Sequence, residues 1–414
     1  MKLWKKKSHQ EILDRVKSAL GQNRSFYEEP ILGMPCSYLD SKIFPGNSPI
    51  LANAPFLQTL VNNPNHIGCH TVAKSEAMFE GTQELERELL DIIACDIFKA
   101  EHGNYDGYVA TGGTESNIQA LWIYREYYKD QGLRNEEIAV LCSEDTHYSI
   151  SKGCNLLCLH QFKIQVNPET RKMAYEDISG LLRNLKESRV KGVVFVANMM
   201  TTMFGSVDDI DVIASALQGS GLDFKIHVDS AYGGFYYPFV DVVTHLDFSN
   251  PLISSITVDA HKMVQAPYGT GIFLIRKGYM KYTLNQNASY VKGEDYTLVG
   301  SRSGANAVAV WMILAAHGSH GWSEKVLILK KRTDWICQKL KESKINFFRE
   351  KKSNIVTIPA KHINPKLEKK YYLVPDSHSK PSWYKIIVME HVSVGFLESL
   401  VEDLGLGLEL AEHF

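Results

Sequence analysis

The sequence predicts an α/β fold in which helices cover both faces of a mostly parallel sheet. Short runs rich in Val and Ile are apolar throughout, which is typical of strands buried on both faces. Stretches with helical spacing separate several of these runs, as in βαβ units. Near Gly304 the pattern changes to long helical stretches and short strand-like pieces. That change predicts a smaller α+β unit at the C-terminal end.

The predicted elements follow one another along the chain. Strands are expected at 137–143, 192–198, 225–229, 253–259 and 271–276. Helices are expected at 115–128, 177–187 and 208–216, then at 305–317, 323–343 and 394–404, with strand-like pieces at 354–359 and 384–390. We therefore expect a helix and a wrapping segment over residues 1–50, a large domain over 51–304 and a small domain over 305–414.

Composition excludes several classes of protein. The chain has 44% hydrophobic and 22% charged residues, an ordinary globular composition that excludes disordered and collagen-like chains. A net charge of −2 argues against nucleic-acid binding through a dense basic face. Seven cysteines, an odd number at irregular spacing, predict no disulfide framework. With neither a signal peptide nor an apolar run of about 20 residues, we expect a cytoplasmic protein without membrane contact.

A Gly-Gly turn leads directly into the helix predicted near residue 115. In the segment ATGGTES, Gly112 and Gly113 stand between Thr111 and Thr114. Free N–H groups, the positive end of the helix dipole and two hydroxyls together suit a phosphate. The alternative is a plain helix start at a tight turn. Neither a GxGxxG nor a GxxxxGK[ST] motif occurs, which weakens dinucleotide and nucleoside-triphosphate binding.

Three further polar residues follow predicted strands. Asp229 ends one strand, where a buried carboxylate needs a cationic partner such as a protonated ring nitrogen; the alternative is a turn cap. Lys262 follows another strand, and a desolvated lysine can form a Schiff base; the alternative is a surface lysine. His147 follows a third strand and can stack on a planar ring or transfer a proton; the alternative is an ordinary loop histidine.

The combination is more specific than any of its parts. A phosphate cradle, a stacking histidine, a strand-end aspartate and a strand-end lysine appear in this order along one α/β chain. These are the four groups that pyridoxal 5′-phosphate requires: a phosphate grip, a stacking partner, a pyridinium partner and a Schiff-base lysine.

Several motifs extend this pattern over residues 65–321. They are FEGTQELERE, TGGTESN, THYS, TTMFGSVDDI, HVDSAYGGF, DAHKM and VGSRSGAN. This set resembles the pyridoxal-phosphate-dependent group II amino-acid decarboxylases, and in particular the archaeal tyrosine/aspartate decarboxylases. The resemblance implies the aspartate-aminotransferase-like (type I) pyridoxal-phosphate fold and a homodimer with shared active sites.

The resemblance also implies roles for individual residues. Lys262 would be the Schiff-base lysine, Asp229 the pyridinium partner and His147 the stacking residue. The remaining assignments are Gly113, Thr114 and His261 at the phosphate, Thr202 beneath or beside the ring, Ala231 on the ring face opposite His147, and Tyr290 as a mobile-loop proton donor. Ser301 would reach a phosphate across the dimer interface. Asp259 replaces the Asn of some relatives, which leaves its contact with the cofactor open.

The expected reaction is decarboxylation of an aromatic or acidic L-amino acid to the amine and CO₂. The main alternative is an aldehyde lyase of the sphingosine-phosphate lyase type, and an aminotransferase or a non-catalytic cofactor-binding protein are more distant ones. No metal is expected. The groups His66, Cys69 and His70, and Cys154, Cys158 and His160, lack a second pair of ligands at zinc-site spacing.

Overall fold

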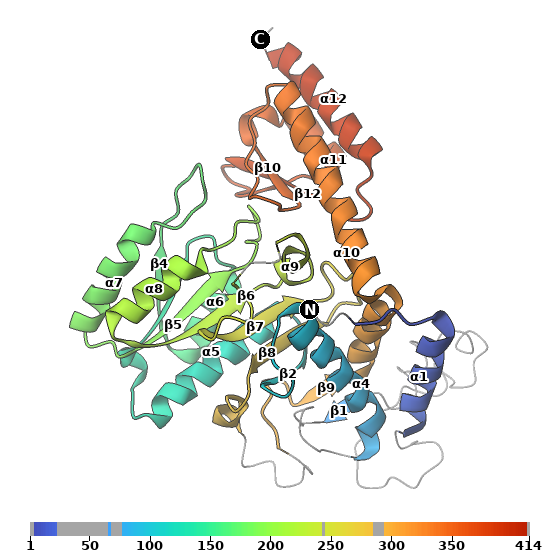
Figure 1. The fold of residues 1–414 in the computed structure, drawn as a ribbon. Helices are drawn as coiled ribbons and strands as arrows, with labels where there is room; N and C mark the ends of the chain where they lie inside the picture. The colour runs from blue at the N-terminus through green and yellow to red at the C-terminus, as the bar shows by residue number, and fades with distance from the viewer. Residues whose placement is uncertain (1–3, 23–64, 68–76, 242–244, 285–293, 412–414) are drawn as a thin grey trace.

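The computed structural model describes residues 4–22, 65–67, 77–241, 245–284 and 294–411 (Figure 1). A large sheet with its helices forms the main body, and a smaller unit stands beyond it at the C-terminal end. The sheet has seven strands in the order β2-β8-β7-β6-β5-β3-β4. They are β2 Tyr105–Ala110, β3 Ile138–Ser143, β4 His160–Ile164, β5 Gly192–Asn198, β6 Asp223–Asp229, β7 Ile253–Asp259 and β8 Gly271–Arg276.

The direction of the strands confirms the predicted mostly parallel sheet. Strands β4, β3, β5, β6 and β7 are mutually parallel, and β8 runs antiparallel to both of its neighbours. All five strands predicted in the large domain lie in this sheet. The other two were not predicted. β4, with the sequence HQFKI, lies at one edge and is largely exposed or half-buried, so it lacks the continuous apolar run of a central strand.

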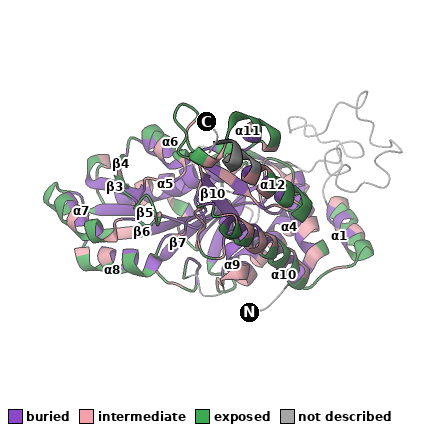
Figure 2. Ribbon diagram, turned by 90° about the horizontal axis from the view of Figure 1, so that it is seen from above, coloured by how far each residue is buried: buried purple, intermediate pink, exposed green. Residues whose placement is uncertain are grey.

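Alternate side chains of each strand enter two different cores. On β5, Val193 and Phe195 pack on one face while Val194 and Val196 pack on the other. The first core faces α4 (Glu80–Asp91), α7 (Tyr175–Glu187), α8 (Ile210–Ser220) and part of α10 (Gly304–Glu342), and the second faces α5 (Gly113–Asp130) and α6 (Tyr148–Leu157). In Figure 2 the central strands of the sheet are buried, and the helices that cover them are exposed on their outer sides. Burial on both faces explains why these strands are apolar throughout.

The smaller unit has a core of its own. Its sheet runs β10-β12-β11, with β10 at Ile355–Pro359, β11 at Val374–Pro375 and β12 at Trp383–Ile387, all antiparallel. Helices α11 (Pro365–Tyr371) and α12 (Val394–Ala411) and the end of α10 enclose a third apolar cluster. Helix α10 therefore connects the two bodies, as Figure 1 shows.

Three connections outside the main layers stabilise the large body. Helix α1 (His9–Gln22) packs against α4, where Arg15 bonds Glu88 at 2.6 Å. Strand β1 (Asn65–Ile67) pairs with β9 (Ser301–Ser303). On β9, Arg302 forms a fully buried ion pair with Glu86 at 2.6 Å. The predicted wrapping segment beyond α1 lies outside the described residues.

Short helical segments complete the described chain. They are η1 Ala77–Phe79, η2 Ile92–Ile97 (a π-helix), η3 Asn135–Glu137, η4 Gly233–Phe235, α9 Tyr237–Val240, η5 Met280–Thr283 and η6 Ala360–His362. None of the helices in the described part of the chain is long and apolar enough to cross a membrane.

The two helices predicted at 305–317 and 323–343 correspond to the two parts of α10, which meet at a kink. At the kink Gly318 has φ +61° and ψ +171°, a conformation that an L side chain rarely adopts. A Cβ atom there would also lie 2.5 Å from the backbone nitrogen of Lys6. The kink thus depends on glycine for its backbone angle and for the close approach of the N-terminal segment.

Gly318→Ala is expected to destabilise the protein by about 1–3 kcal/mol, because both the backbone strain and the clash must be accommodated. The measurement is urea denaturation of the variant and the wild type. Gly321→Ala, three residues further along the same helix, is the matched control, because a Cβ atom there would lie 3.9 Å from Cβ of His317, an ordinary van der Waals contact. Equal stability of the Gly318 variant and the wild type would contradict this account of the kink.

Candidate active site

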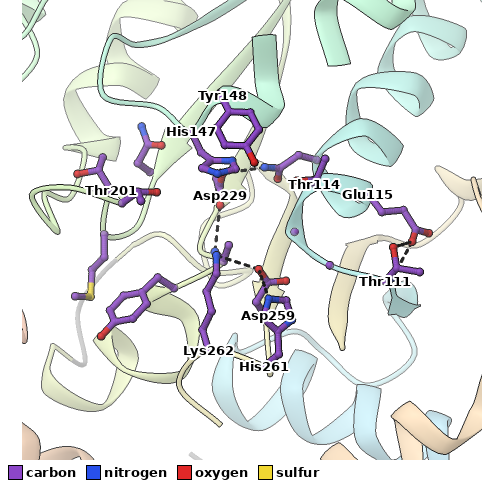
Figure 3. Close-up of a pocket in the computed structure, with 18 residues that line it drawn as sticks. Thr111, Thr114, Glu115, His147, Tyr148, Thr201, Asp229, Asp259, His261 and Lys262 are labelled. Carbon is purple, nitrogen blue, oxygen red and sulfur yellow. Dashed lines mark hydrogen bonds and ion pairs between the residues drawn. The ribbon is translucent and has the colours of Figure 1, made fainter. Parts of the chain in front are cut away.

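A cavity of about 320 Å³ lies where the parallel strands end (Figure 3). In open α/β sheets ligands bind outside the carboxyl ends of the strands. Asn198, Asp229 and Asp259 are the last residues of β5, β6 and β7, and all three line the cavity. The remaining lining residues are Thr111, Gly112, Gly113, Thr114, Glu115, Asn117, His147, Tyr148, Met200, Thr201, Thr202, Ala231, Tyr232, His261 and Lys262.

The start of α5 forms one end of the cavity. Its first residues, Gly113 and Thr114, carry backbone N–H groups that have no partner within the helix. A Cβ atom on Gly113 would lie 2.9 Å from Oδ2 of Asp259 and 3.1 Å from Cβ of Ala231, so only glycine fits here without rearrangement. Glu115 fixes the preceding turn by accepting hydrogen bonds from the amide and the hydroxyl of Thr111, both at 2.7 Å. This end of the cavity suits an anion.

Lys262 reaches into the cavity beside Asp259. Its Nζ lies 3.0 Å from Oδ2 of Asp259, and Nε2 of His261 lies 3.6 Å from the same oxygen. Among the described residues, Oδ1 of Asp259 and Nδ1 of His261 are buried and have no hydrogen-bond partner. Buried polar atoms without partners are costly, so these two atoms point to a polar ligand in the cavity.

Asp229 is almost fully buried at the end of β6. Its Oδ2 accepts a hydrogen bond from Nδ2 of Asn117 at 2.8 Å, and its Oδ1 accepts one from the amide of Ala231 at 3.1 Å. Both oxygens are therefore held in place, and the carboxylate still lines the cavity. Such a group stabilises a cationic ligand atom.

His147 caps the start of α6 and lines the same cavity. Its Nδ1 accepts from the amide of Ser149 at 3.3 Å and lies 2.9 Å from the Ser149 hydroxyl. Burial lowers the pKa of His147 below 6.5, although the nearby Asp229 opposes this shift. The imidazole is therefore predominantly neutral at pH 7.

The predicted site residues are thus largely brought together. Gly113, Thr114, His147, Thr202, Asp229, Ala231, Asp259, His261 and Lys262 all line the cavity. Ser301 is exposed on β9 and is not among the lining residues of this single chain. Tyr290 lies outside the described residues. These residues fit pyridoxal phosphate: a helix start for the phosphate, a buried carboxylate for a ring nitrogen and a lysine amine for the aldehyde.

The structure adds residues that the sequence analysis missed. Asn117 and Asn198 line the cavity. Asn117 stands four residues after Gly113, one turn into α5, and this helical spacing could have identified it. Lys385 of β12, in the smaller unit, donates to the carbonyl of Thr202 at 3.0 Å. Nothing in the sequence near Lys385 indicated this contact, because it depends on how the two bodies pack.

One group of metal-ligand types lies apart from the cavity lining. Among the described residues, Asp91, Cys95 and His102 could each direct one ligand atom toward a common ion. Burial and the adjacent Asp91 raise the pKa of the Cys95 thiol to about 12, which disfavours the thiolate that a metal requires.

Behind the cavity, His227 on β6 is fully buried. Burial lowers its pKa from 6.5 to about 4. Between these two values the unfolded chain binds a proton that the folded protein excludes. The free energy of unfolding is therefore not reduced by His227 above about pH 6.5, and it falls as the pH decreases from 6.5 toward 4.

We predict that titration of His227 makes the free energy of unfolding of the wild type about 2 kcal/mol lower at pH 5 than at pH 8. His227→Gln should be less stable than the wild type at pH 8 but should lack this part of the pH dependence. Urea denaturation at both pH values measures the difference. His378→Gln, at an exposed histidine, is the control. If the free energy of unfolding of His227→Gln still changed between pH 5 and pH 8 as much as that of the wild type, His227 would not be the cause.

Comparison with known proteins identifies the family. The conserved domain of pyridoxal-dependent decarboxylases matches residues 64–357. A tryptophan decarboxylase of Clostridium sporogenes is 44% identical over 406 residues, which cover 98% of this chain and 97% of the relative. A probable L-tyrosine/L-aspartate decarboxylase of Methanocella arvoryzae is 30% identical and covers 84% of this chain and 92% of its own.

Solved structures confirm the predicted fold class. The L-methionine decarboxylase of Streptomyces sp. 590 superposes with a TM-score of 0.70 at 19% identity, covering 82% of this chain and 86% of its own. A sphingosine-1-phosphate lyase of Burkholderia pseudomallei reaches 0.67 at 17% identity, with 81% and 78% covered. At these identities the likeness concerns the fold alone. On the family match and the sequence relatives, the chain belongs to the pyridoxal-phosphate-dependent group II amino-acid decarboxylases.

Proposed function

We propose that this enzyme decarboxylates an aromatic L-amino acid, with tryptophan the first candidate, to the amine and CO₂. The observation that carries the proposal is the 44% identity, over nearly the full length of both chains, with a tryptophan decarboxylase. The described lining of the cavity agrees with an uncharged side chain. Within it, Lys262 is the only lysine or arginine, and Tyr148, Met200 and Tyr232 offer aromatic and apolar surface.

When bound, pyridoxal phosphate supplies an aldehyde that condenses with amines and a pyridinium ring that accepts the electron pair left by departing CO₂. In our proposal Gly113, Thr114 and His261 would hold the phosphate, and Lys262 would be the amine that the aldehyde meets. Lys262 would then have to leave its ion pair with Asp259, whose Oδ2 lies 3.0 Å from its Nζ. Asp259 would then remain beside His261, whose pKa burial lowers although the charge of Asp259 opposes that shift.

Asp229 would keep the ring nitrogen protonated through its negative charge, because its carboxylate is held by two hydrogen bonds and lines the cavity. His147 and Ala231 would cover opposite faces of the ring, and Thr202 would lie beneath or beside it. The residues around the cavity would also have to orient the substrate so that the bond from Cα to the carboxylate is the one that breaks. Tyr290, or His147, would return a proton to Cα, a contribution of about 10²–10⁴-fold.

An acidic substrate is the second candidate, and one observation favours it. Lys385 lies at the edge of the site with its ammonium group on the carbonyl of Thr202. Burial and the charge of Lys262 lower the pKa of Lys385 below 10.5. A substrate carboxylate could replace the Thr202 carbonyl as its partner. Only the similarity of the fold supports the aldehyde-lyase alternative, and that similarity does not indicate a substrate.

We also propose a cytoplasmic homodimer. In it, Ser301 would contact the phosphate held by the second subunit. The exposure of Ser301 on β9 and of Tyr268, which is 89% exposed beside His261, agrees with an interface at this edge.

Purified enzyme loaded with pyridoxal phosphate should release CO₂ from tryptophan or another aromatic L-amino acid, measured across the common L-amino acids. Lys262→Ala should abolish release because the aldehyde then has no lysine partner. Lys277→Ala, a change at an exposed surface lysine, is the control. Release from aspartate or glutamate alone, lost in Lys385→Met, would replace the aromatic assignment by the acidic one.

Tyr290→Phe should retain cofactor affinity and lower the rate of amine formation by about 10²-fold, since the donor hydroxyl is gone. Cofactor titration and amine quantification give the two numbers. Tyr372→Phe, at an 88% exposed tyrosine of the smaller unit, is the matched control. Normal amine formation by Tyr290→Phe would eliminate Tyr290 as the donor.

A further inference from the structure

We propose that Asn117 and Ser149 are positioning residues that connect Asp229 to His147 and hold His147 as the neutral tautomer with its proton on Nε2. In this state His147 presents an N–H that donates a hydrogen bond toward the substrate, and it does not act as a base. The inference deepens the proposed function, because it assigns a protonation state to a residue of that same site. It rests on a chain of hydrogen bonds that begins behind the cavity and ends in it.

The amide of Asn117 lies at the centre of this chain and is 1% exposed. Its Nδ2 lies 2.8 Å from Oδ2 of Asp229 and 2.8 Å from the hydroxyl of Ser149. A carboxylate only accepts hydrogen bonds, so Nδ2 must be the atom that faces Asp229. Both of its hydrogens are then used, one for each partner.

The hydroxyl of Ser149 must therefore donate its own hydrogen elsewhere. It accepts from Asn117, and the next polar atom is Nδ1 of His147 at 2.9 Å. The backbone amide of Ser149 donates to the same Nδ1 at 3.3 Å. Two donors directed at Nδ1 leave no place for a proton on that atom. A neutral imidazole then carries its proton on Nε2.

The other end of the chain agrees with this assignment. Oδ1 of Asn117 is an acceptor and lies 2.9 Å from Nε2 of His227, which must donate. Since burial keeps His227 neutral at pH 7, its Nδ1 carries no proton and accepts from the hydroxyl of Ser255 at 2.6 Å. The hydroxyl of Tyr124 in turn bonds Ser255. One arrangement of hydrogens thus satisfies the whole chain from Tyr124 to His147.

The groups that face His147 do not favour a cation. Burial is the largest influence on its pKa and lowers it, and the positive charges of Lys262 and Lys152 act in the same direction. Asp229 and Asp259 oppose them. Figure 3 shows His147 beside Asp229 and Tyr148 at the top of the cavity, above Lys262. A fixed N–H at this place can bind an oxygen of the substrate.

The direct test is ¹⁵N NMR of the cofactor-loaded enzyme labelled at histidine, with the His147 signals identified by their loss in His147→Gln. The expected spectrum between pH 7 and 8.5 has an unprotonated Nδ1 and a protonated Nε2 for His147. A proton on Nδ1, or a cationic ring, would overturn the proposal. This readout does not use turnover, so it stands apart from the substrate assignment.

Two variants test the connection itself. Asn117→Ala should convert His147 to a mixture of tautomers, weaken pyridoxal phosphate binding through Asp229 and lower kcat about tenfold or more with a smaller change in KM. Ser149→Ala should alter the tautomer signals while leaving cofactor affinity nearly unchanged, and it keeps the proposal testable if Asn117→Ala fails to fold.

Gln119→Ala is the matched control. Gln119 is equally buried on the same helix, but it bonds Tyr296 and Leu298, which do not belong to the series of hydrogen bonds between Tyr124 and His147. Its His147 spectrum should match that of the wild type. Unaltered His147 signals in both Asn117→Ala and Ser149→Ala would contradict the positioning role, whatever the activity. Absence of CO₂ release from every amino acid, with the tautomer as expected, would instead count against the proposed reaction alone.

Discussion

Carboxylates at the ends of apolar, fully buried strands are the constraint on which the rest of this structure depends. Asp229 and Asp259 end neighbouring parallel strands, with β6 and β7 in register up to Asp229 and Thr257. Each charge is costly to bury without partners. The chain supplies those partners from other elements: Asn117 of α5 for Asp229, and Lys262 for Asp259. The cavity exists where these partners leave one side of each carboxylate to a ligand.

The start of α5 completes the same site because it packs against both strand ends. Gly113 approaches Asp259 and Ala231 so closely that any side chain would displace them. The helix that offers its N-terminus to a phosphate therefore also carries Asn117, one turn later, to the buried face of Asp229. One helix thus supplies residues to both ends of the proposed cofactor site, Gly113 at the phosphate and Asn117 at Asp229.

Much of this arrangement could be predicted from the sequence, for a physical reason. Strands buried on both faces must be apolar, so their limits and the polar residues that end them are visible in the chain. His147, Asp229 and Lys262 are identified in this way, and Gly113 is identified by the Gly-Gly turn that leads directly into a helix. The edge strand β4 was not, because half-exposed strands lack that pattern. Lys385 and the path from Asn117 to His227 were not found either, because they depend on contacts between distant segments.

If these side chains hold pyridoxal phosphate, the cofactor aldehyde should be bonded to Lys262. Borohydride reduction of the loaded enzyme, followed by digestion and mass spectrometry, locates the modified lysine. One lysine should carry the reduced pyridoxyl group, and it should be Lys262. Modification at another lysine, or none in an enzyme that has bound the cofactor, would contradict this assignment.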